Sequence, residues 1–403
     1  PALAPALVSE AFRQMHMGRP RPVALEMPWD MFTTSAPVTL LPPAPPVPPI
    51  EVDPQAVTKT VELLRGARNP MLMVGGGAQH AHAEVRALAE QLQAPVVSYR
   101  SGRGVVADDH PLGFTCAAGF KRWAQTDVLV GIGSRLEMQW YRWPNAPRDL
   151  QIINIDIDPA QVARIRPTVA ITADAQDAAR SLTEALVRDG VRAADRSAEF
   201  EAVKAQTLAQ ARAVQPHMDY LAAIRRVLPR DGFFVEEICQ AGFTSYFGFP
   251  VYTPGSYVTC GFQATLGYGY ATALGVKVGN PRRAVVSIAG DGGFMFGVQE
   301  LATAVQYGIG VVVIVFNNRA FGNVRRDQQQ RFDGRVIGTD LVNPDFMKLA
   351  DSFGMACDRV STPHALQVSL ERALAADAPA LIEVEVDARS EVSPWGFLMP
   401  PAA

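Results

Sequence analysis

Short apolar runs recur along this chain of 403 residues, and most end in glycine or in a polar residue. Such runs are typical of strands that are buried on both faces of a parallel sheet. Helical sequence separates most of them, so the chain repeats a strand–helix rhythm. The sequence therefore predicts an α/β fold with two parallel-sheet, Rossmann-like domains. The predicted strands are 71–74, 95–98, 127–133 and 151–156 in the first half, and 233–235, 284–288, 310–316 and 380–384 in the second.

A proline-rich stretch divides the first of these regions from a short leading segment. Residues 37–50 contain seven prolines, which cannot donate backbone hydrogen bonds, so this stretch predicts a stiff extended linker. Before it we expect a helix over 7–17 and a strand over 22–28, too little to bury a core. The predicted domain order is a partial unit over 1–36, the linker over 37–50, a Rossmann-like domain over 51–190, a helical linker over 191–214 and a second domain over 215–403.

Charge, hydropathy and cysteine spacing exclude several classes of partner. The net charge of −3 provides no basic surface for nucleic acid. The longest apolar stretch, 309–316, is far shorter than the roughly 20 residues of a membrane helix. The four cysteines lie far apart, which argues against a zinc site or a disulfide framework and fits a reducing compartment. We expect a cytoplasmic protein without nucleic-acid or membrane partners.

One strand of the second half runs directly into a glycine turn. The strand 284–288 is followed by Gly290, Asp291, Gly292 and Gly293, and a helix is predicted over 295–307. At the carboxyl end of a parallel strand, such a turn directs backbone N–H groups toward an anion. Asp291 would repel a phosphate there unless a divalent cation lay between the two groups.

The next predicted strand ends in Asn317 and Asn318. Neighbouring parallel strands bring their carboxyl ends to the same edge of a sheet, so these amides are expected near Asp291. Mg²⁺ combines carboxylate or amide oxygens with phosphate oxygens. The sequence therefore predicts a Mg²⁺–phosphate site at this edge.

This pattern resembles the signature of the thiamine diphosphate enzymes, in which Gly-Asp-Gly is followed after about 25 residues by Asn-Asn at the end of an apolar strand. The surrounding sequence, including 299–304, is similar to the acetolactate synthase branch, which also contains 2-oxo acid decarboxylases. The resemblance implies that Mg²⁺ is held by Asp291, Asn318 and the carbonyl of Ala320. It also implies that the thiamine diphosphate contacts Gly290, Asp291, Gly292, Gly293 and Asn318.

Two further segments extend the resemblance. Leu266 stands where the family places a large apolar residue under the thiazolium ring. Ile238, Cys239 and Gln240 resemble the loop on the diphosphate side. The family synthases commonly carry Gly and His where this chain has Cys239 and Ala241, so a histidine side chain has no role here.

The acid that activates the cofactor is not among these residues. Thiamine chemistry needs a carboxylic acid at a pyrimidine nitrogen, and in the family a glutamate of an amino-terminal domain supplies it. Residues 10–28 resemble only the end of that domain, so 1–36 is interpreted as its remnant. Glu26 is interpreted as a surface carboxylate, and the catalytic residue is left unassigned. We expect the chain alone to be inactive, as either a truncated product or a subunit that needs a partner.

The resemblance implies a function and a set of partners. The expected reaction is the thiamine diphosphate- and Mg²⁺-dependent cleavage or formation of the C–C bond next to the carbonyl of a 2-oxo acid. The alternative is a catalytically silent cofactor-binding module, or a subunit whose partner supplies the glutamate. A homo-oligomer with its active site at a subunit interface is expected.

Three other segments have two interpretations each. FAD or ADP could bind the central domain, as in some members, but tight strand-to-helix packing explains the glycine run 75–77 more simply. Arg325 and Arg326 could receive a substrate carboxylate or be solvated surface residues. Residues 393–397 could close over the site or anchor the tail. The lack of a tryptophan near Asp327 argues against acetohydroxy-acid synthesis.

Overall fold

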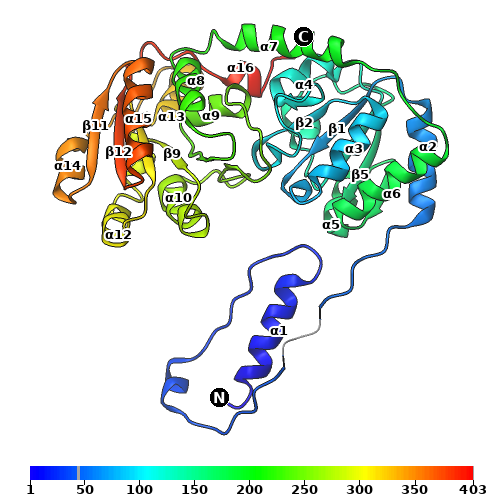
Figure 1. The fold of residues 1–403 in the computed structure, drawn as a ribbon, viewed down its shortest axis with the longest axis horizontal. Helices are drawn as coiled ribbons and strands as arrows, with labels where there is room; N and C mark the ends of the chain where they lie inside the picture. Colours follow the sequence, from blue (N-terminus) through cyan, green and yellow to red (C-terminus); the bar gives the residue numbers. More distant parts are fainter. Residues whose placement is uncertain (43–45, 403) are drawn as a thin grey trace.

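Two six-stranded sheets form the core of the molecule, which confirms the predicted α/β class. The computed structural model describes residues 1–42 and 46–402. In Figure 1 the two sheets lie side by side, each covered by helices, and residues 1–42 and 46–50 extend away from both as an arm. Three residues of the expected linker, 43–45, lie outside the described residues; 37–42 and 46–50 form neither helix nor strand.

The first sheet is parallel throughout and has its switch in strand order at the centre. The second and third strands add on one side of the first strand, and the later strands add on its other side. The loops that follow the two central strands therefore diverge and leave a crevice between them. In spatial order its strands are β3 (Gly113–Thr115), β2 (Val96–Ser98), β1 (Pro70–Val74), β4 (Val128–Ile132), β5 (Gln151–Asp156) and β6 (Val169–Thr172). The helices around it are α2 (Pro54–Gly66), α3 (His82–Leu92), α4 (Cys116–Trp123), α5 (Pro159–Ile165) and α6 (Ala175–Arg188), with short turns η2 (Gly76–Ala78), η3 (Arg100–Gly102) and η4 (Met138–Arg142).

The second sheet is also parallel, and its switch lies between β7 and β9. In spatial order its strands are β11 (Ala356–Val360), β12 (Ala380–Glu385), β10 (Val312–Asn317), β9 (Val285–Gly290), β7 (Phe233–Val235) and β8 (Tyr257–Val258). Its helices are α8 (His217–Val227), α9 (Gln240–Gly248), α10 (Tyr268–Gly279), α11 (Asp291–Phe294), α12 (Glu300–Tyr307), α13 (Gly322–Arg331), α14 (Phe346–Ser352), α15 (Pro363–Ala376) and α16 (Trp395–Leu398).

Apolar strands and aspartate caps explain why these segments fold as they do. All six residues of β10 are buried, as expected for a central parallel strand. Several helices begin after an aspartate whose carboxylate accepts a backbone N–H of the first turn, which stabilises each start by about 1 kcal/mol. The three around the first sheet are Asp53, Asp158 and Asp174. None of the helices in the described part of the chain is long and apolar enough to span a membrane.

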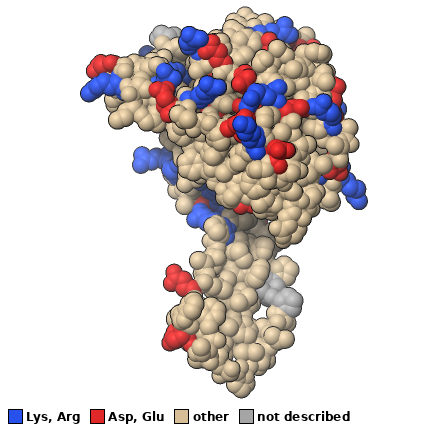
Figure 2. Space-filling model, turned by 90° about the vertical axis from the view of Figure 1, so that its left-hand side faces the viewer, with Lys and Arg blue, Asp and Glu red and all other residues tan. Residues whose placement is uncertain are grey.

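The leading segment differs from its prediction. Its helix is present as α1 (Ala4–His16), but the strand expected over 22–28 is wrong. Those residues are exposed and pair with no strand among the described residues, and three prolines within 20–28 remove donors that a ladder would need. Glu26 is exposed, as expected. Figure 2 shows few charges on this arm, and its exposed apolar side chains include Phe12, Leu25, Met27, Trp29 and Phe32, the last two on the short turn η1 (Trp29–Thr33).

The helix expected over 295–307 is also wrong as a single element. The chain forms the one-turn helix α11 directly at the glycine turn and then starts α12 only at Glu300. Gly297 lies in the break, where a residue of low helix propensity interrupts the pattern. The helical turn therefore begins at Asp291 itself.

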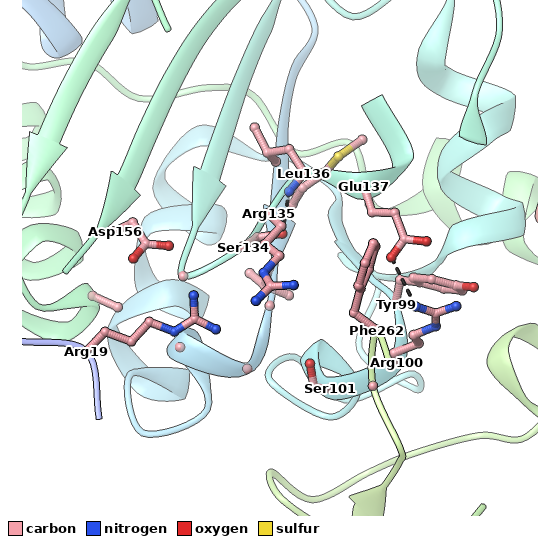
Figure 3. Close-up of a pocket in the computed structure, with 18 of the residues that line it drawn as sticks. Arg19, Tyr99, Arg100, Ser101, Ser134, Arg135, Leu136, Glu137, Asp156 and Phe262 are labelled. Carbon is pink, nitrogen blue, oxygen red and sulfur yellow. Dashed lines mark hydrogen bonds and ion pairs between the residues drawn. The ribbon is translucent and has the colours of Figure 1, made fainter. Parts of the chain in front are cut away.

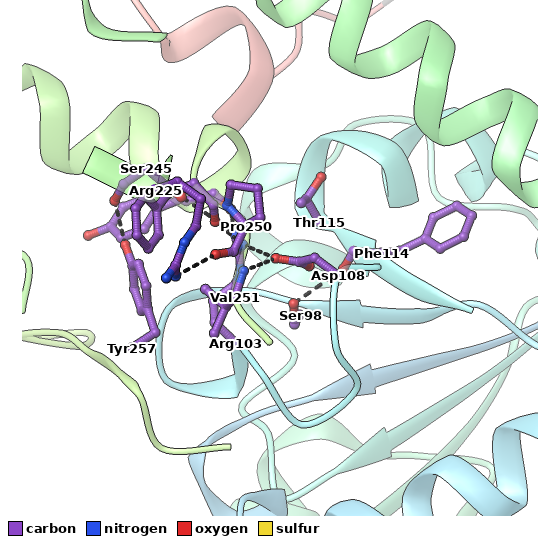
Figure 4. A network of polar contacts seen from close by, with 12 residues as sticks. Ser98, Arg103, Asp108, Phe114, Thr115, Arg225, Ser245, Pro250, Val251 and Tyr257 are labelled. Atoms are coloured by element: carbon purple, nitrogen blue, oxygen red, sulfur yellow. Dashed lines mark hydrogen bonds and ion pairs between the residues drawn. The ribbon is translucent and has the colours of Figure 1, made fainter. Parts of the chain in front are cut away.

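One buried cation joins the two halves of the molecule. Arg103, in the loop after η3, is fully buried and donates to the carbonyl oxygens of Tyr246 and Phe249, the latter at 2.6 Å. The same guanidinium lies 2.5 Å from a carboxylate oxygen of Asp108, which in turn accepts the N–H of Val251 at 2.7 Å. Figure 4 shows this network between the first sheet and the end of α9.

We predict that Arg103→Ala lowers the free energy of unfolding by about 3–5 kcal/mol, because it leaves a buried carboxylate and two buried carbonyls without their partner. The first transition in urea-induced unfolding measures this. Arg65→Ala is the matched control: Arg65 pairs with Asp189 at 2.8 Å on the surface, and losing such a pair costs less than about 1 kcal/mol. Equal losses in the two variants would contradict the role assigned to Arg103.

Candidate functional site

The loops after β7, β9 and β10 converge at the switch point of the second sheet. Because all three strands are parallel, their carboxyl ends meet at one edge. A Cβ atom built on Gly290 would lie 3.0 Å from Cys239 Cβ, which brings the loop after β7 against the turn after β9. Ile238 is half-buried, and Cys239 caps α9 by accepting the N–H of Gly242 at its sulfur, at 3.3 Å. Gln240 is the first residue of that helix.

Asp291 is buried at the start of α11, with 1% of its surface exposed. Burial raises the pKa of its carboxyl, while hydrogen bonds from the Asn343 side chain and from backbone N–H groups oppose this shift. Among the described residues no Lys, Arg or His side chain forms an ion pair with it. A buried carboxylate without a cationic partner is costly, so this position suits a metal ion.

Asn343 is a residue that the sequence interpretation missed. Its side-chain Nδ2 donates to Asp291 Oδ2 at 2.7 Å and lies 2.9 Å from Asn317 Oδ1. It follows β10 by more than twenty residues and belongs to no recognised motif. Only the three-dimensional structure shows that this amide donates to one oxygen of Asp291.

The two adjacent asparagines have different surroundings. Asn317 donates to Glu383 Oε1 on the neighbouring strand β12 at 2.7 Å, so its side-chain amide links the two strands. Asn318 lies beyond the strand, and its Oδ1 accepts the N–H of Ala320 at 3.1 Å. Ala320 is buried and forms an isolated bridge with Asp340. Asn318 and Ala320, the residues predicted to bind Mg²⁺, thus lie in one tight turn.

Leu266 and the glycine turn are brought together by the structure. A Cβ built on Gly293 would lie 3.4 Å from Leu266 Cδ2 and only 1.8 Å from Glu237 Oε1, so only glycine fits there. At Gly292 a Cβ would meet the ring of Phe321 at 2.4 Å. The close approach of these side chains explains the glycines on either side of the turn.

Glu237 is a second buried carboxylate beneath this turn. Its Oε2 accepts the N–H of Gly269 at 2.9 Å, and its Oε1 has no hydrogen-bond partner among the described residues. Burial raises the pKa of Glu237 to about 7, although the N–H groups of Gly269 and Gly267 lower it; the neighbouring Glu236 raises it further. A glutamate that is neutral below pH 7 therefore lies against Gly293.

The residues at this edge fit a diphosphate held through a magnesium ion. No three His, Cys, Asp or Glu side chains in the described ranges gather closely enough to hold a metal by themselves. Mg²⁺ does not need such a cage, because it usually combines one carboxylate, one or two neutral oxygens and phosphate oxygens. Asp291 and the turn of Asn318 and Ala320 have oxygens of the kind that such a site needs. The glycines of the turn after β9 carry no side chains that would fill the space beside it.

Arg325 and Arg326 of α13 both have protein partners. Arg325 lies 2.9 Å from Asp340 Oδ1, and Arg326 donates to Ser393 Oγ at 2.5 Å and to Asn323 Oδ1 at 2.7 Å. Trp395 of the tail also donates to Asn323 Oδ1, at 2.7 Å, and packs against Phe243 with ring centroids 5.0 Å apart. The tail is a packed anchor in this structure.

A cavity of about 740 Å³ lies at the switch point of the first sheet. Figure 3 shows Arg19 and Asp156 at one end and Phe262 and Arg100 at the other. Its volume is within the range of small-molecule sites. The glycine run is explained by packing, because a Cβ on Gly75 would lie 2.3 Å from the carbonyl oxygen of Gly133. Binding of FAD or ADP here stays a prediction.

Comparison with known proteins identifies relatives over most of the chain. The family profile "Thiamine pyrophosphate enzyme, C-terminal TPP binding domain" matches residues 238–384, and the profile of the central domain matches 57–182. A probable acetolactate synthase large subunit of Methanocaldococcus jannaschii is 30% identical, over 95% of this chain and 69% of the relative. A probable 2-ketoarginine decarboxylase of Pseudomonas aeruginosa is 30% identical, over 95% and 70%.

A solved structure shares the fold. The thiamine diphosphate-dependent 4-hydroxybenzoylformate decarboxylase of Rhodococcus jostii superimposes with a TM-score of 0.78 at 24% sequence identity, over 96% of this chain and 74% of that one. At this level of identity the likeness supports the arrangement of the two sheets and not a particular substrate.

We predict that Glu237→Gln removes a pH dependence of stability. The folded-state pKa of about 7 lies above the ordinary 4.5, so the protonated group stabilises the fold below pH 4.5 and this stabilisation is lost as the pH rises through 7. The full loss corresponds to roughly 3 kcal/mol. Without cofactor, the variant should therefore be more stable than wild type in urea at pH 8, and close to it at pH 4.5. Glu62→Gln, at an exposed glutamate of α2, should follow wild type at both pH values, and parallel curves for Glu237→Gln and wild type would contradict the prediction.

Proposed function

Because this chain belongs to the thiamine pyrophosphate enzyme family, we propose that the edge formed by β7, β9 and β10 binds thiamine diphosphate through Mg²⁺ for a reaction of a 2-oxo acid. The reaction is the cleavage or formation of the C–C bond next to the carbonyl group. Relatives named as an acetolactate synthase and a 2-ketoarginine decarboxylase support this class of substrate.

The observation that carries the proposal is the buried carboxylate of Asp291. It lies at the start of α11, is 1% exposed and has an amide, Asn343, as its side-chain partner at 2.7 Å. A divalent cation would remove the cost of its burial and would join it to phosphate oxygens. The metal would be held by Asp291, Asn318 Oδ1 and the carbonyl of Ala320.

The remaining site residues would bind and orient the cofactor. The diphosphate would contact Gly290, Gly292 and Gly293 and, across the switch point, the loop of Ile238, Cys239 and Gln240 at the start of α9. Leu266 would support the thiazolium ring from below. When bound, the cofactor supplies an electron sink for the bond that is broken or formed.

Exposed apolar surface beside Leu266 supports a homo-oligomer with the site at a subunit interface. Met295 and Phe296 are 38% and 62% exposed, and Phe296 packs on Gly267, next to Leu266. Apolar surface of this kind marks protein contacts. All four cysteines are free, which supports a cytoplasmic location.

We propose the domain division 1–36, 37–50, 51–190, 191–214 and 215–403 as the functional units. Each of the two larger ranges contains one complete sheet. The range 191–214 holds α7 (Ser197–Ala211), which connects them. The central unit would support the site without contributing metal ligands.

We predict that thiamine diphosphate binds this chain only when Mg²⁺ is present, and that Asp291→Ala abolishes binding because it removes the only carboxylate among the proposed ligands. Isothermal titration calorimetry with and without EDTA measures both effects. Asp351→Ala, at an exposed aspartate of α14, should bind like wild type. Binding that persists in EDTA or in Asp291→Ala would refute the metal site.

Release of CO₂ from pyruvate and benzoylformate distinguishes the enzyme from the silent module. CO₂ release by the wild-type chain that is lost in Asp291→Ala would support the assignment as an enzyme. Metal-dependent binding without turnover of any 2-oxo acid would instead favour a module or subunit that needs a partner's glutamate.

A further inference from the structure

The segment after the last strand returns to the turn that holds Asn318. Glu391 reaches it with its side chain, and its Oε2 accepts from Asn318 Nδ2 at 2.8 Å. The N–H of the next residue, Val392, donates to the carbonyl of Gln215 at 2.8 Å, so the backbone here is also fixed. The carboxylate of Glu391 is only 10% exposed.

His217 lies behind this carboxylate. Its Nε2 is 2.9 Å from Glu391 Oε1, and its side chain is 1% exposed at the start of α8. The ring contacts Phe316 of β10 edge-on, with centroids 5.9 Å apart. Both oxygens of Glu391 therefore have a defined partner, one on a helix and one on the metal turn.

Three segments distant in sequence meet at Gly322. A Cβ built there would lie 3.0 Å from Asn318 Nδ2, 3.7 Å from Gln240 Nε2 and 3.8 Å from Glu391 Oε2. The diphosphate-side loop, the metal turn and the tail thus share one small space, and the absence of a side chain at Gly322 keeps it open.

The orientation of the Asn318 amide matters because only its oxygen can bind a metal ion. The two ends of an amide have nearly the same shape, and hydrogen-bond partners decide which end points where. Glu391 accepts only from the NH₂ end, and the N–H of Ala320 donates only to the oxygen end, at 3.1 Å. With both partners in place the amide has one orientation.

We propose that Glu391, supported by His217, is a positioning residue that orients the Asn318 amide so that its oxygen is available to Mg²⁺. This inference rests on the proposed function, since it assigns Asn318 as a ligand. It makes the carboxyl-terminal tail part of the metal site. Groups that orient a metal ligand in this way typically change metal affinity by about 10- to 100-fold when removed.

The test compares Mg²⁺ affinity in variants of the full chain at a fixed, saturating concentration of thiamine diphosphate, by calorimetry. Glu391→Ala should weaken Mg²⁺ binding at least about tenfold. Glu391→Gln should stay close to wild type, because its carbonyl oxygen still accepts from Asn318. Glu391→Asp keeps the charge but withdraws the oxygens from Asn318, so it should resemble the alanine variant.

Controls separate this role from folding and from the proposed function. Asp387→Ala removes an exposed tail carboxylate that pairs with Arg389 at 3.2 Å, and it should leave Mg²⁺ affinity unchanged. Thermal unfolding without cofactor establishes that each variant is folded, and Glu391→Asp replaces Glu391→Ala if the latter is not. Wild-type Mg²⁺ affinity in every folded variant of the pair Glu391→Ala and Glu391→Asp, with Asp291→Ala still unable to bind, would overturn the role of Glu391 but not the metal site. Binding by Asp291→Ala would overturn the metal site and both proposals.

Discussion

The parallel pairing of β7, β9 and β10 is the constraint on which the candidate site depends. Strands that run in the same direction must end at the same edge, so each following loop starts there. The switch in strand order between β7 and β9 then sends the next helices to opposite faces and leaves room between them. Cys239, Asp291 and Asn318 are neighbours for this reason, although about 80 residues separate Cys239 from Asn318.

Burial of charge is the second physical theme of this edge. Asp291 and Glu237 both lie out of water, and burial raises the pKa of each. Their partners differ: the Asn343 amide and backbone N–H groups contact Asp291, whereas Glu237 has only backbone N–H groups as partners among the described residues. An added cation would favour the ionised form of Asp291, whereas burial favours the protonated form of Glu237.

Sequence patterns pointed to those parts of the candidate site that depend on local structure. The apolar strands, the glycine turn and Asn318 follow from periodicity and from residues adjacent in the chain. Asn343, Glu391 and His217 could not be found in this way, because each reaches the site from a separate loop, tail or helix start and forms no motif. The strand over 22–28 failed because a short apolar run does not reveal whether a partner strand exists, and the helix over 295–307 failed because Gly297 interrupts it.

The position of Arg103 has an electrostatic consequence for the other sheet. Helix α9 has nine residues, so it is about 13 Å long, and its first turn faces the glycine turn while its last carbonyls face Arg103. The aligned peptide dipoles of a helix place partial positive charge at its start and partial negative charge at its end. The guanidinium of Arg103 satisfies carbonyls at this negative end while Asp108 neutralises its own charge, so a loop of the first domain fixes the direction of a helix whose start faces the second sheet's glycine turn.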